Sequence, residues 1–269
     1  MADVLNEIYE NIFLPTSYGF RERKNCHQAI SQLNWLIMTK KVNYILDADI
    51  KGFFDNIDHE IMMMFLKEKI ADKNFLRYIK RFLKAGVMED NQYYESYKGT
   101  PQGGLISPIL ANVYLHYVLD NWFRCIKKDL KGEAYLIRYA DDFVVLFQYE
   151  ETASKFYQML IERMKKFKLE LAEDKTIILP FGRFKGTKET FDFLGFTFGN
   201  GQTTDGKYRP NITTSKKKLK QIFETVKKWL HDRMHEPIII TGESLKRKIV
   251  GHYAYYGING NYKSLIKIH

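Results

Sequence analysis

Residues 134–147 have the sequence Ala-Tyr-Leu-Ile-Arg-Tyr-Ala-Asp-Asp-Phe-Val-Val-Leu-Phe, two apolar runs separated by a short acidic stretch. The runs 134–139 and 143–147 have the length and the composition typical of buried strands. Ala140-Asp141-Asp142 between them is short enough for a hairpin turn. The stretch therefore predicts two antiparallel strands with carboxylates in the turn that joins them.

A second strand with acidic side chains is predicted upstream. Residues 42–50 alternate so that Ile45, Asp47 and Asp49 share one face, and Asp49 lies at the strand end. Amphipathic stretches predict helices on either side, so the fold class is α+β. The other predicted helices span residues 4–13, 25–40, 58–69, 72–85, 107–128, 151–168, 215–235 and 242–256, and the other predicted strands span 176–180 and 191–198. The Gly-rich residues 199–206 are predicted to form a linker.

Three tracts contain groups suited to chemistry on phosphate. They are Asp-Ala-Asp-Ile-Lys-Gly-Phe-Phe-Asp (47–55), Gln-Gly-Gly-Leu-Ile-Ser-Pro (102–108) and Tyr-Ala-Asp-Asp (139–142). Carboxylates from a strand end and a hairpin turn can converge on one point, as hard cations such as Mg²⁺ require. Two such ions clamp the attacking and leaving oxygens of a phosphoryl transfer. A Gly-Gly pair lets backbone approach a nucleotide or template strand closely. Together the tracts indicate nucleotidyl transfer.

In this order the three tracts resemble the motif set of reverse transcriptases. Residues 18–21 (Tyr-Gly-Phe-Arg), 27–30 (His-Gln-Ala-Ile), 193–196 (Phe-Leu-Gly-Phe) and 251–261 resemble further segments of the group II intron enzymes. The similarity therefore covers nearly the whole chain.

The resemblance implies a right-hand polymerase. Residues 1–40 would be the remainder of the fingers, 41–206 a palm with an antiparallel sheet and packed helices, and 207–269 a partial, basic, α-helical thumb or maturase region. Complete enzymes of this family have a further fingers segment before the tract that begins at Tyr18. We expect that segment to be missing here.

The resemblance also implies a metal site. Asp49 and Asp141 would hold two Mg²⁺ ions, for which Mn²⁺ could substitute, with Asp142 in support and the carbonyl oxygen of Ile50 as a further ligand. Asp47 is the alternative to Asp49, but the family pattern counts from the Asp that precedes Ile50.

Nucleotide-binding roles follow from the same resemblance. Phe54 matches the aromatic residue that packs under the sugar and excludes a 2′-hydroxyl, and core packing is the alternative, more so for Phe53. Lys175 matches the lysine thought to protonate the leaving pyrophosphate, and an ordinary lysine at a helix end is its alternative. Gln102 and Gly103 would approach the template or the incoming nucleotide.

Contacts with nucleic acid are expected at Tyr139, Leu194 and Gly195, and Arg138 is an alternative charge near the acidic hairpin. Residues 207–269 hold 14 Lys and Arg against 4 Asp and Glu, whereas residues 1–206 hold 28 of each. A basic segment of this kind suits a phosphate backbone, although a solubilising surface helix is equally compatible with composition alone. The resemblance implies a thumb helix that follows the template–primer duplex or intron RNA, with Lys216, Lys217, Lys220 and Lys227 at helical spacings.

The expected activity is RNA-directed DNA polymerisation, with RNA template, DNA primer and dNTPs as partners and group II intron RNA as a further one. The alternative is a catalytically inactive, maturase-like remnant that binds intron RNA for splicing. Cys26 and Cys125 are too far apart in sequence to suggest a disulfide framework or a zinc site. No apolar run approaches the roughly 18 residues that a membrane span needs. These features predict a soluble, cytoplasmic protein and leave the oligomeric state open.

Overall fold

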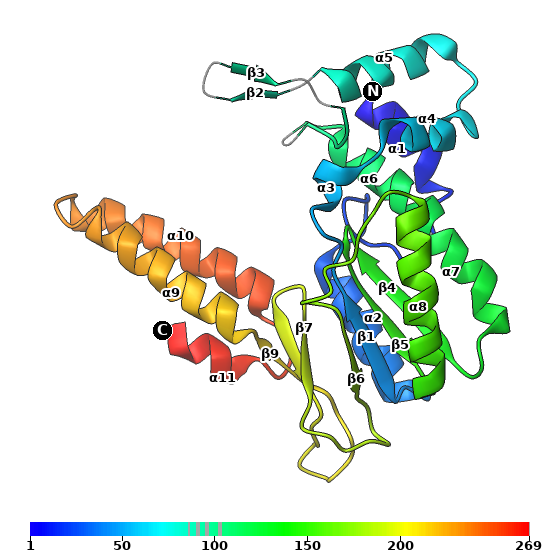
Figure 1. Ribbon diagram of the computed structural model, residues 1–269. Coiled ribbons are helices and arrows are strands. Elements are labelled where there is room, and N and C mark those ends of the chain that lie inside the picture. Colours follow the sequence, from blue (N-terminus) through cyan, green and yellow to red (C-terminus); the bar gives the residue numbers. More distant parts are fainter. Residues whose placement is uncertain (86, 90–91, 95–96, 102–103, 269) are drawn as a thin grey trace. The chain divides into compact units, whose positions relative to one another are not determined.

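The computed structural model describes residues 1–85, 87–89, 92–94, 97–101 and 104–268. The chain divides into two compact units, Met1–Lys185 and Gly186–His269, and each is described by itself below. Figure 1 shows the course of the chain through both units. The first unit ends at Lys185. The sequence alone places the end of the palm later, at residue 206, after the Gly-rich residues 199–206.

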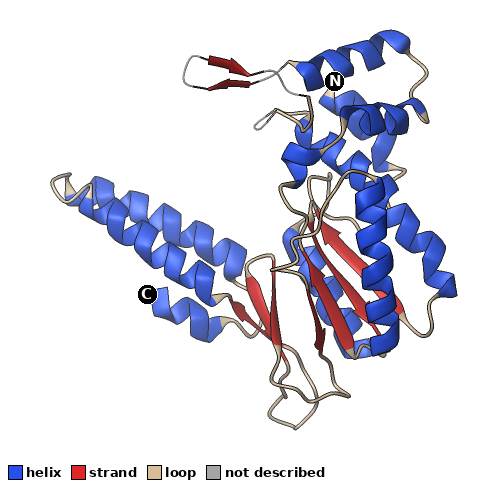
Figure 2. Ribbon diagram, viewed as in Figure 1, coloured by secondary structure: helices blue, strands red, loops and turns tan. Residues whose placement is uncertain are grey.

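The first unit is built on a four-stranded antiparallel sheet. Its order is β4 (Ala134–Tyr139), β5 (Asp142–Phe147), β1 (Tyr44–Ala48), β6 (Ile177–Pro180) (Figure 2). The predicted hairpin is confirmed, because Tyr139 pairs with Asp142 and leaves a two-residue turn between β4 and β5. β1 lies beside β5 with Ala48 opposite Phe143. β4 is an edge strand.

Alternating side chains of the sheet face two different layers of helices. Leu46, Val145 and Leu136 join the main hydrophobic core, together with residues of α6 (Ser107–Leu115) and α8 (Glu150–Lys166). The buried residues that alternate with these along each strand face the other side of the sheet. On that side α2 (Cys26–Thr39) lies against β4 (Figure 1). The sheet is therefore covered on both faces by helices.

The predicted helix over 107–128 is continuous but changes its winding. The α-helix α6 passes into the π-helix η1 (His116–Asp120), then α7 (Asn121–Ile126) and the 3₁₀ turn η2 (Lys127–Asp129). Asp120 ends the π segment and is fully buried. Its carboxylate pairs with Arg138 of β4, so the change of winding coincides with an internal ion pair.

The remaining helices of the first unit follow the predicted stretches closely. Asp58 and Asp72 cap α4 (His59–Lys67) and α5 (Lys73–Lys84) by accepting hydrogen bonds from backbone amides, as their residue type favours. Asn25 caps α2 in a capping box with Gln28. The other elements are α1 (Ala2–Glu10), the short α3 (Phe53–Asn56), which the sequence analysis did not predict, and the hairpin β2 (Val87–Glu89) and β3 (Gln92–Tyr94).

The second unit contains a three-stranded antiparallel sheet that corrects two predictions. Residues 191–198 are not one strand: β7 (Thr190–Phe193) and β8 (Phe196–Gly199) are joined by a turn at Leu194-Gly195, where both residues have positive φ. The Gly-rich residues 199–206 are not a linker, because they connect β8 to β9 (Asn211–Thr214) within the same sheet. The first error arises because a tight turn of Leu and Gly interrupts an apolar run without a polar residue. The second arises because a Gly-rich stretch can connect two strands of one sheet as well as two domains.

Three helices follow the sheet of the second unit. α9 (Lys216–His231) is capped by Ser215, and α10 (Ile238–Tyr256) begins before the predicted residue 242. The buried Asn261 lies just before α11 (Tyr262–Leu265) and η3 (Ile266–Ile268), and its side chain bonds both the amide and the hydroxyl of Thr214 on β9. None of the helices in the described residues is long and apolar enough to cross a membrane.

Candidate active site

Asp49 lies one residue beyond β1, at the end of the sheet that carries the β4–β5 turn. Since Ala48 pairs with Phe143, the next residue along β1 comes beside Asp142. The backbone here is held from the other side as well: the Asp49 carbonyl accepts a hydrogen bond from the Ala172 amide (2.8 Å), and Ile50 forms a bridge with Leu171. The acidic end of β1 is thus fixed between the hairpin and the segment that follows α8.

The turn at residues 140–141 is held by close backbone packing. Ala140 adopts a left-handed conformation with φ of 57°, which a non-glycine residue occupies at some cost. Gly19 runs so close to the Ala140 amide that a Cβ at this position would collide with it. Asn112 donates a hydrogen bond to the Gly19 carbonyl (2.7 Å), which keeps the segment around Gly19 against the turn.

Arg138 secures the same turn from inside the protein. The side chain is fully buried, and its Nε and Nη2 donate to the two carboxylate oxygens of Asp120, which is also fully buried. Its Nη1 donates to the carbonyl oxygen of Ala140 (2.8 Å) and to Asn112 Oδ1 (2.9 Å). Because these internal bonds use its donors, Arg138 acts on the acidic hairpin through its charge and through its support of the turn.

Asp141 and Asp49 lie close enough to affect each other's charge. Burial raises the pKa of the Asp141 carboxyl, and the negative charge of Asp49 raises it further. A hydrogen bond from its own backbone amide and the positive charge of Arg138 act in the opposite direction. Like-charged groups that are brought together in this way are stabilised when a cation binds between them.

The ammonium group of Lys175 lies beside Asp49. Its Nζ lies 3.0 Å from Asp49 Oδ2, and this hydrogen bond and the charge of Asp49 raise the pKa of the Lys175 amine. Both side chains retain substantial solvent access. They border a pocket of about 520 Å³ that is lined by Asp49, Lys51, Gly52 and residues 170–175. The pair is therefore accessible and exchangeable rather than a buried structural ion pair.

The residues present fit a hard divalent cation in their chemistry. Asp49 and Asp141 offer carboxylate oxygens from two adjacent chain segments, and Asp142 follows directly on β5. Within the described ranges of the chain, no three Asp, Glu, His or Cys side chains converge as a ready metal site. Asp49 and Asp141 would hold the ion, and Asp142 and the nearby backbone would complete its ligands.

Comparison with known proteins identifies the family. The family described as reverse transcriptase (RNA-dependent DNA polymerase) matches residues 1–198. The chain belongs to the reverse transcriptase family. It is of the group II intron type: LtrA, a group II intron-encoded protein of Lactococcus lactis subsp. cremoris, is 40% identical over 131 residues, which are 49% of this chain and 21% of LtrA. An uncharacterized 91 kDa protein in the cob intron of Schizosaccharomyces pombe is 40% identical over 131 residues, covering 48% of this chain and 16% of that protein.

A solved structure confirms the right-hand polymerase fold. Apo telomerase from Candida tropicalis, truncated from its C-terminal domain, matches 74% of this chain and 42% of its own, with a TM-score of 0.56 and 16% identity. The α+β class and the antiparallel palm sheet predicted from sequence are thereby confirmed. The matched part of this chain spans about a fifth or less of the length of LtrA and the cob intron protein.

Two aromatic residues of this chain follow Gly52, which has a positive φ at the start of α3. Phe53 points into the core and is 2% exposed. Phe54 is only partly buried, and its carbonyl accepts a hydrogen bond from the Thr100 amide (2.8 Å). Phe53 is thus the core residue of the pair, whereas the side chain of Phe54 keeps a surface that a sugar could contact.

The other predicted contact residues are distributed over the chain. Tyr139 is half-buried beside the acidic turn, where burial raises the pKa of its hydroxyl. Gln102 and Gly103 lie outside the described residues. In the second unit, the Leu194 carbonyl accepts a hydrogen bond from Tyr255, and the Gly195 carbonyl accepts one from the Ser215 amide. The predicted lysines of α9, Lys216, Lys217, Lys220 and Lys227, belong to a helix with no buried residue.

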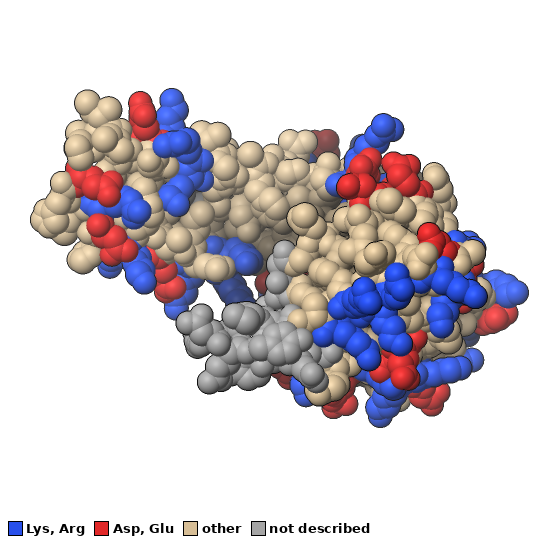
Figure 3. Space-filling model, turned by 90° about the horizontal axis from the view of Figure 1, so that it is seen from above, with Lys and Arg blue, Asp and Glu red and all other residues tan. Residues whose placement is uncertain are grey.

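The charge count over residues 1–206 concealed a basic surface on α5. This helix buries Leu76, Ile79 and Leu83 and exposes its cations on the other side. Figure 3 looks down on the end of the first unit that carries α5 and shows Lys and Arg side chains gathered there. The cations of this surface are Lys73, Arg77, Lys80, Arg81 and Lys84. Helical periodicity over residues 72–85 is the sequence pattern that could have revealed it.

Proposed function

We propose that this chain copies RNA into DNA by nucleotidyl transfer with two divalent metal ions. The observation that carries the proposal is the meeting of Asp49 and Asp141 at the end of the palm sheet in a member of the reverse transcriptase family. Mg²⁺ ions, for which Mn²⁺ could substitute, would stabilise the attacking and leaving oxygens of the transfer. An RNA template, a DNA primer and dNTPs are the proposed partners.

The side chains around the pair have distinct proposed roles. Asp49 and Asp141 supply charge that orients the ions, with Asp142 in support and the Ile50 carbonyl nearby. Lys175 holds a proton at Nζ within reach of Asp49, and the raised pKa keeps it protonated at neutral pH. Displaced from Asp49, this ammonium would face the leaving pyrophosphate and donate its proton there.

Positioning of the nucleotide is assigned to residues outside the carboxylate pair. Phe54 would pack under the incoming sugar and exclude a 2′-hydroxyl. Gln102, Gly103 and Tyr139 would contact the nucleotide or the template strand. In the second unit, the turn at Leu194-Gly195 and the lysines of α9 would follow the phosphate backbone without reading its sequence.

The biological setting belongs to the same proposal. Group II intron RNA is the proposed further partner, since the relatives include intron-encoded proteins. Cys26 and Cys125 are both free thiols, which is compatible with a reducing cytoplasm.

A maturase-like protein that binds intron RNA without catalysis is the second candidate. The ion pair of Lys175 with Asp49 favours it, because this contact neutralises one of the two carboxylates without a metal. A pure RNA-binding protein, however, has no need for acidic side chains that repel phosphate. The polymerase accounts for the two carboxylates of Asp49 and Asp141, and the maturase-like protein does not.

The test is primer extension on an RNA template with dNTPs and Mg²⁺, comparing the wild-type chain with Asp141→Asn. We expect the variant to extend at least about a hundredfold more slowly, because even indirect support of a metal ligand contributes about 10- to 100-fold. RNA binding, measured by fluorescence anisotropy, should be unchanged and serves as the control. If neither protein extends a primer while both bind RNA equally, the polymerase proposal fails and the maturase-like alternative replaces it.

A further inference from the structure

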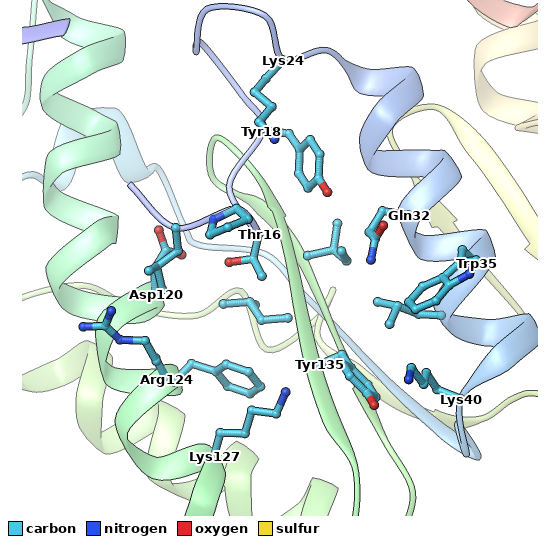
Figure 4. A pocket seen from close by; sticks show the side chains of 16 residues that line it. Thr16, Tyr18, Lys24, Gln32, Trp35, Lys40, Asp120, Arg124, Lys127 and Tyr135 are labelled. Carbon is cyan, nitrogen blue, oxygen red and sulfur yellow. The ribbon is translucent and has the colours of Figure 1, made fainter. Parts of the chain in front are cut away.

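A pocket in the first unit lies apart from the carboxylate pair and has its own composition. It has a volume of about 610 Å³ and shares no lining residue with the pocket of Asp49 and Lys175. It opens at the outer edge of β4, between α2 on one side and η1, α7 and η2 on the other (Figure 4). Its volume lies within the range typical of sites for small molecules and cofactors.

The walls of this pocket combine cations with aromatic rings. The Lys127 ammonium lies 4.5 Å from the ring centre of Tyr135, Lys40 lies 5.3 Å from Trp35, and Lys24 lies 5.0 Å from Tyr18. Each of these three pairs brings an ammonium group over the face of an aromatic ring. Figure 4 shows the Lys24 pair at one end of the pocket and the other two pairs toward the opposite end.

The charge of the lining is strongly positive. Arg124 is the fourth cation, and the one acid, Asp120, is already bound to Arg138 inside the protein. Burial lowers the pKa of the Lys127 amine, and the neighbouring Lys40 lowers it further, while Glu133 acts in the opposite direction. Cations that repel one another across a cavity are stabilised when an anion binds between them.

Two further features of the pocket favour a ligand with a planar, hydrogen-bonding part. Trp35 is 47% exposed although it lies beside the buried face of α2. Gln32 also lines the cavity with its side-chain amide. An exposed indole offers a stacking surface for a nucleobase, and an amide can bond to the edge of that base.

We propose that this pocket binds a nucleotide, with its base against Trp35 or Tyr135 and its phosphate between Lys40 and Lys127. An acidic peptide could satisfy the cations, but it would leave the exposed indole of Trp35 without a stacked ring and the Gln32 amide without the edge of a base. The same chemistry occurs in a free nucleotide and in one residue of a single-stranded RNA. The site is separate from the proposed polymerase site, so it does not depend on catalysis.

The test uses probes that report on the pocket itself, because basic helices elsewhere in the chain also attract RNA. AMP, a single-stranded RNA hexamer with one 4-thiouridine, and a hexaglutamate peptide are added separately to the full chain. Isothermal titration calorimetry measures the binding of each probe. Photo-crosslinking of the 4-thiouridine, followed by mass spectrometry, locates the contact. We expect crosslinks to peptides that contain Trp35 or Tyr135.

Matched variants distinguish this site from general attraction to phosphate. Trp35→Ala should raise the Kd for the crosslinking hexamer about tenfold, and Trp35→Phe should restore most of the affinity. Lys40→Gln with Lys127→Gln should reduce crosslinking at the pocket at least as strongly. Lys155→Gln with Lys165→Gln, two exposed lysines of α8, should leave it unchanged.

The outcomes separate the possible ligands. AMP binding that the Trp35 variant abolishes, without an RNA crosslink in the pocket, assigns a free nucleotide. A pocket crosslink with the hexamer assigns single-stranded RNA. Binding of hexaglutamate in preference to both nucleotide probes overturns the proposal, as does the absence of both a crosslink and a Trp35-dependent AMP signal.

Discussion

At the scale of single residues, the site is defined by where charges are buried. Asp141 is pushed toward its neutral form by burial and by Asp49, whereas Arg138 and Asp120 are buried as a mutually satisfied pair. The first arrangement is unfavourable in the absence of a cation, and the second holds the turn at Ala140 in its left-handed conformation. The buried carboxylate of Asp141 thus lowers the stability of the folded state, and the proposed chemistry needs that carboxylate.

The raised pKa of Asp141 predicts a stability that depends on pH. Because the folded state holds this proton more tightly than the unfolded state, its contribution is fully present below the ordinary pKa of about 3.8 and is lost as pH rises through the raised value. We expect Asp141→Asn to unfold at a higher urea concentration than the wild type at pH 7 in EDTA, and the difference should shrink as the pH is lowered toward the ordinary pKa of 3.8.

Asp58 provides the control with the opposite sign. Burial tends to raise the pKa of its carboxyl, but hydrogen bonds from Lys168 and from the amides of Ile61 and Glu60 outweigh it and lower the pKa. Its stabilisation is therefore present above the ordinary pKa and lost as pH falls through the lowered one. Asp58→Asn should lose stability at pH 7. If Asp141→Asn is less stable than the wild type at the same pH, the charge of Asp141 does not destabilise the folded state.

The buried ion pair predicts a large effect from a single substitution. Arg138→Met leaves the Asp120 carboxylate buried without its partner, and we expect a loss of about 3–5 kcal/mol in the free energy of unfolding. Arg138→Met combined with Asp120→Leu should lose less, because the unpaired charge is gone. Chemical denaturation measures all three proteins.

An exposed ion pair offers the comparison for this experiment. Lys131 and Glu151 lie 3.9 Å apart with side chains that are 72% and 88% exposed. Lys131→Ala should cost no more than about 1 kcal/mol. Equal losses from Arg138→Met and Lys131→Ala would exclude a structural role for the buried pair.

At the scale of elements, cations gather on helices in both units. α9 has no buried residue and presents Lys217 and Lys220 to solvent, while α5 buries three apolar residues and exposes five cations. α9 is the helix that the sequence resemblance connects with the thumb. α5 is a second basic surface, and in the sequence only the helical periodicity of its apolar residues indicates it.

Binding of RNA should therefore depend on salt through α9. Lys217→Gln with Lys220→Gln should flatten the slope of log affinity against log salt by about 1.4 for single-stranded RNA, because each lost phosphate contact contributes about 0.7. Anisotropy titrations at several salt concentrations measure the slope. Lys155→Gln with Lys165→Gln on α8 is the charge-matched control. An unchanged slope in the α9 variant would move the contact to another basic surface, of which α5 is the next to test.

At the scale of the whole molecule, the change in charge along the chain and the boundary between the two compact units fall at different residues. The last 63 residues carry the entire excess of positive charge, but the compact second unit begins earlier, at Gly186. The β7–β9 sheet accounts for the difference, since its pairing of Phe198 with Ile212 joins residues on both sides of the Gly-rich stretch. A change of composition therefore did not mark the boundary of a folding unit.

The amino-acid sequence alone determined the family, the fold class, the acidic hairpin and most helices, because period-two and period-3.6 patterns, caps and ordered motifs are local. It also predicted that Asp49 and Asp141 lie together, and the charge of Asp49 does act on Asp141. Only the tertiary structure decided that Arg138 is a buried support for the turn, that Lys175 lies on Asp49, and that Trp35, Lys40 and Lys127 line one pocket. These relations join residues far apart in sequence, and only packing of the sheet with its helices brings them together.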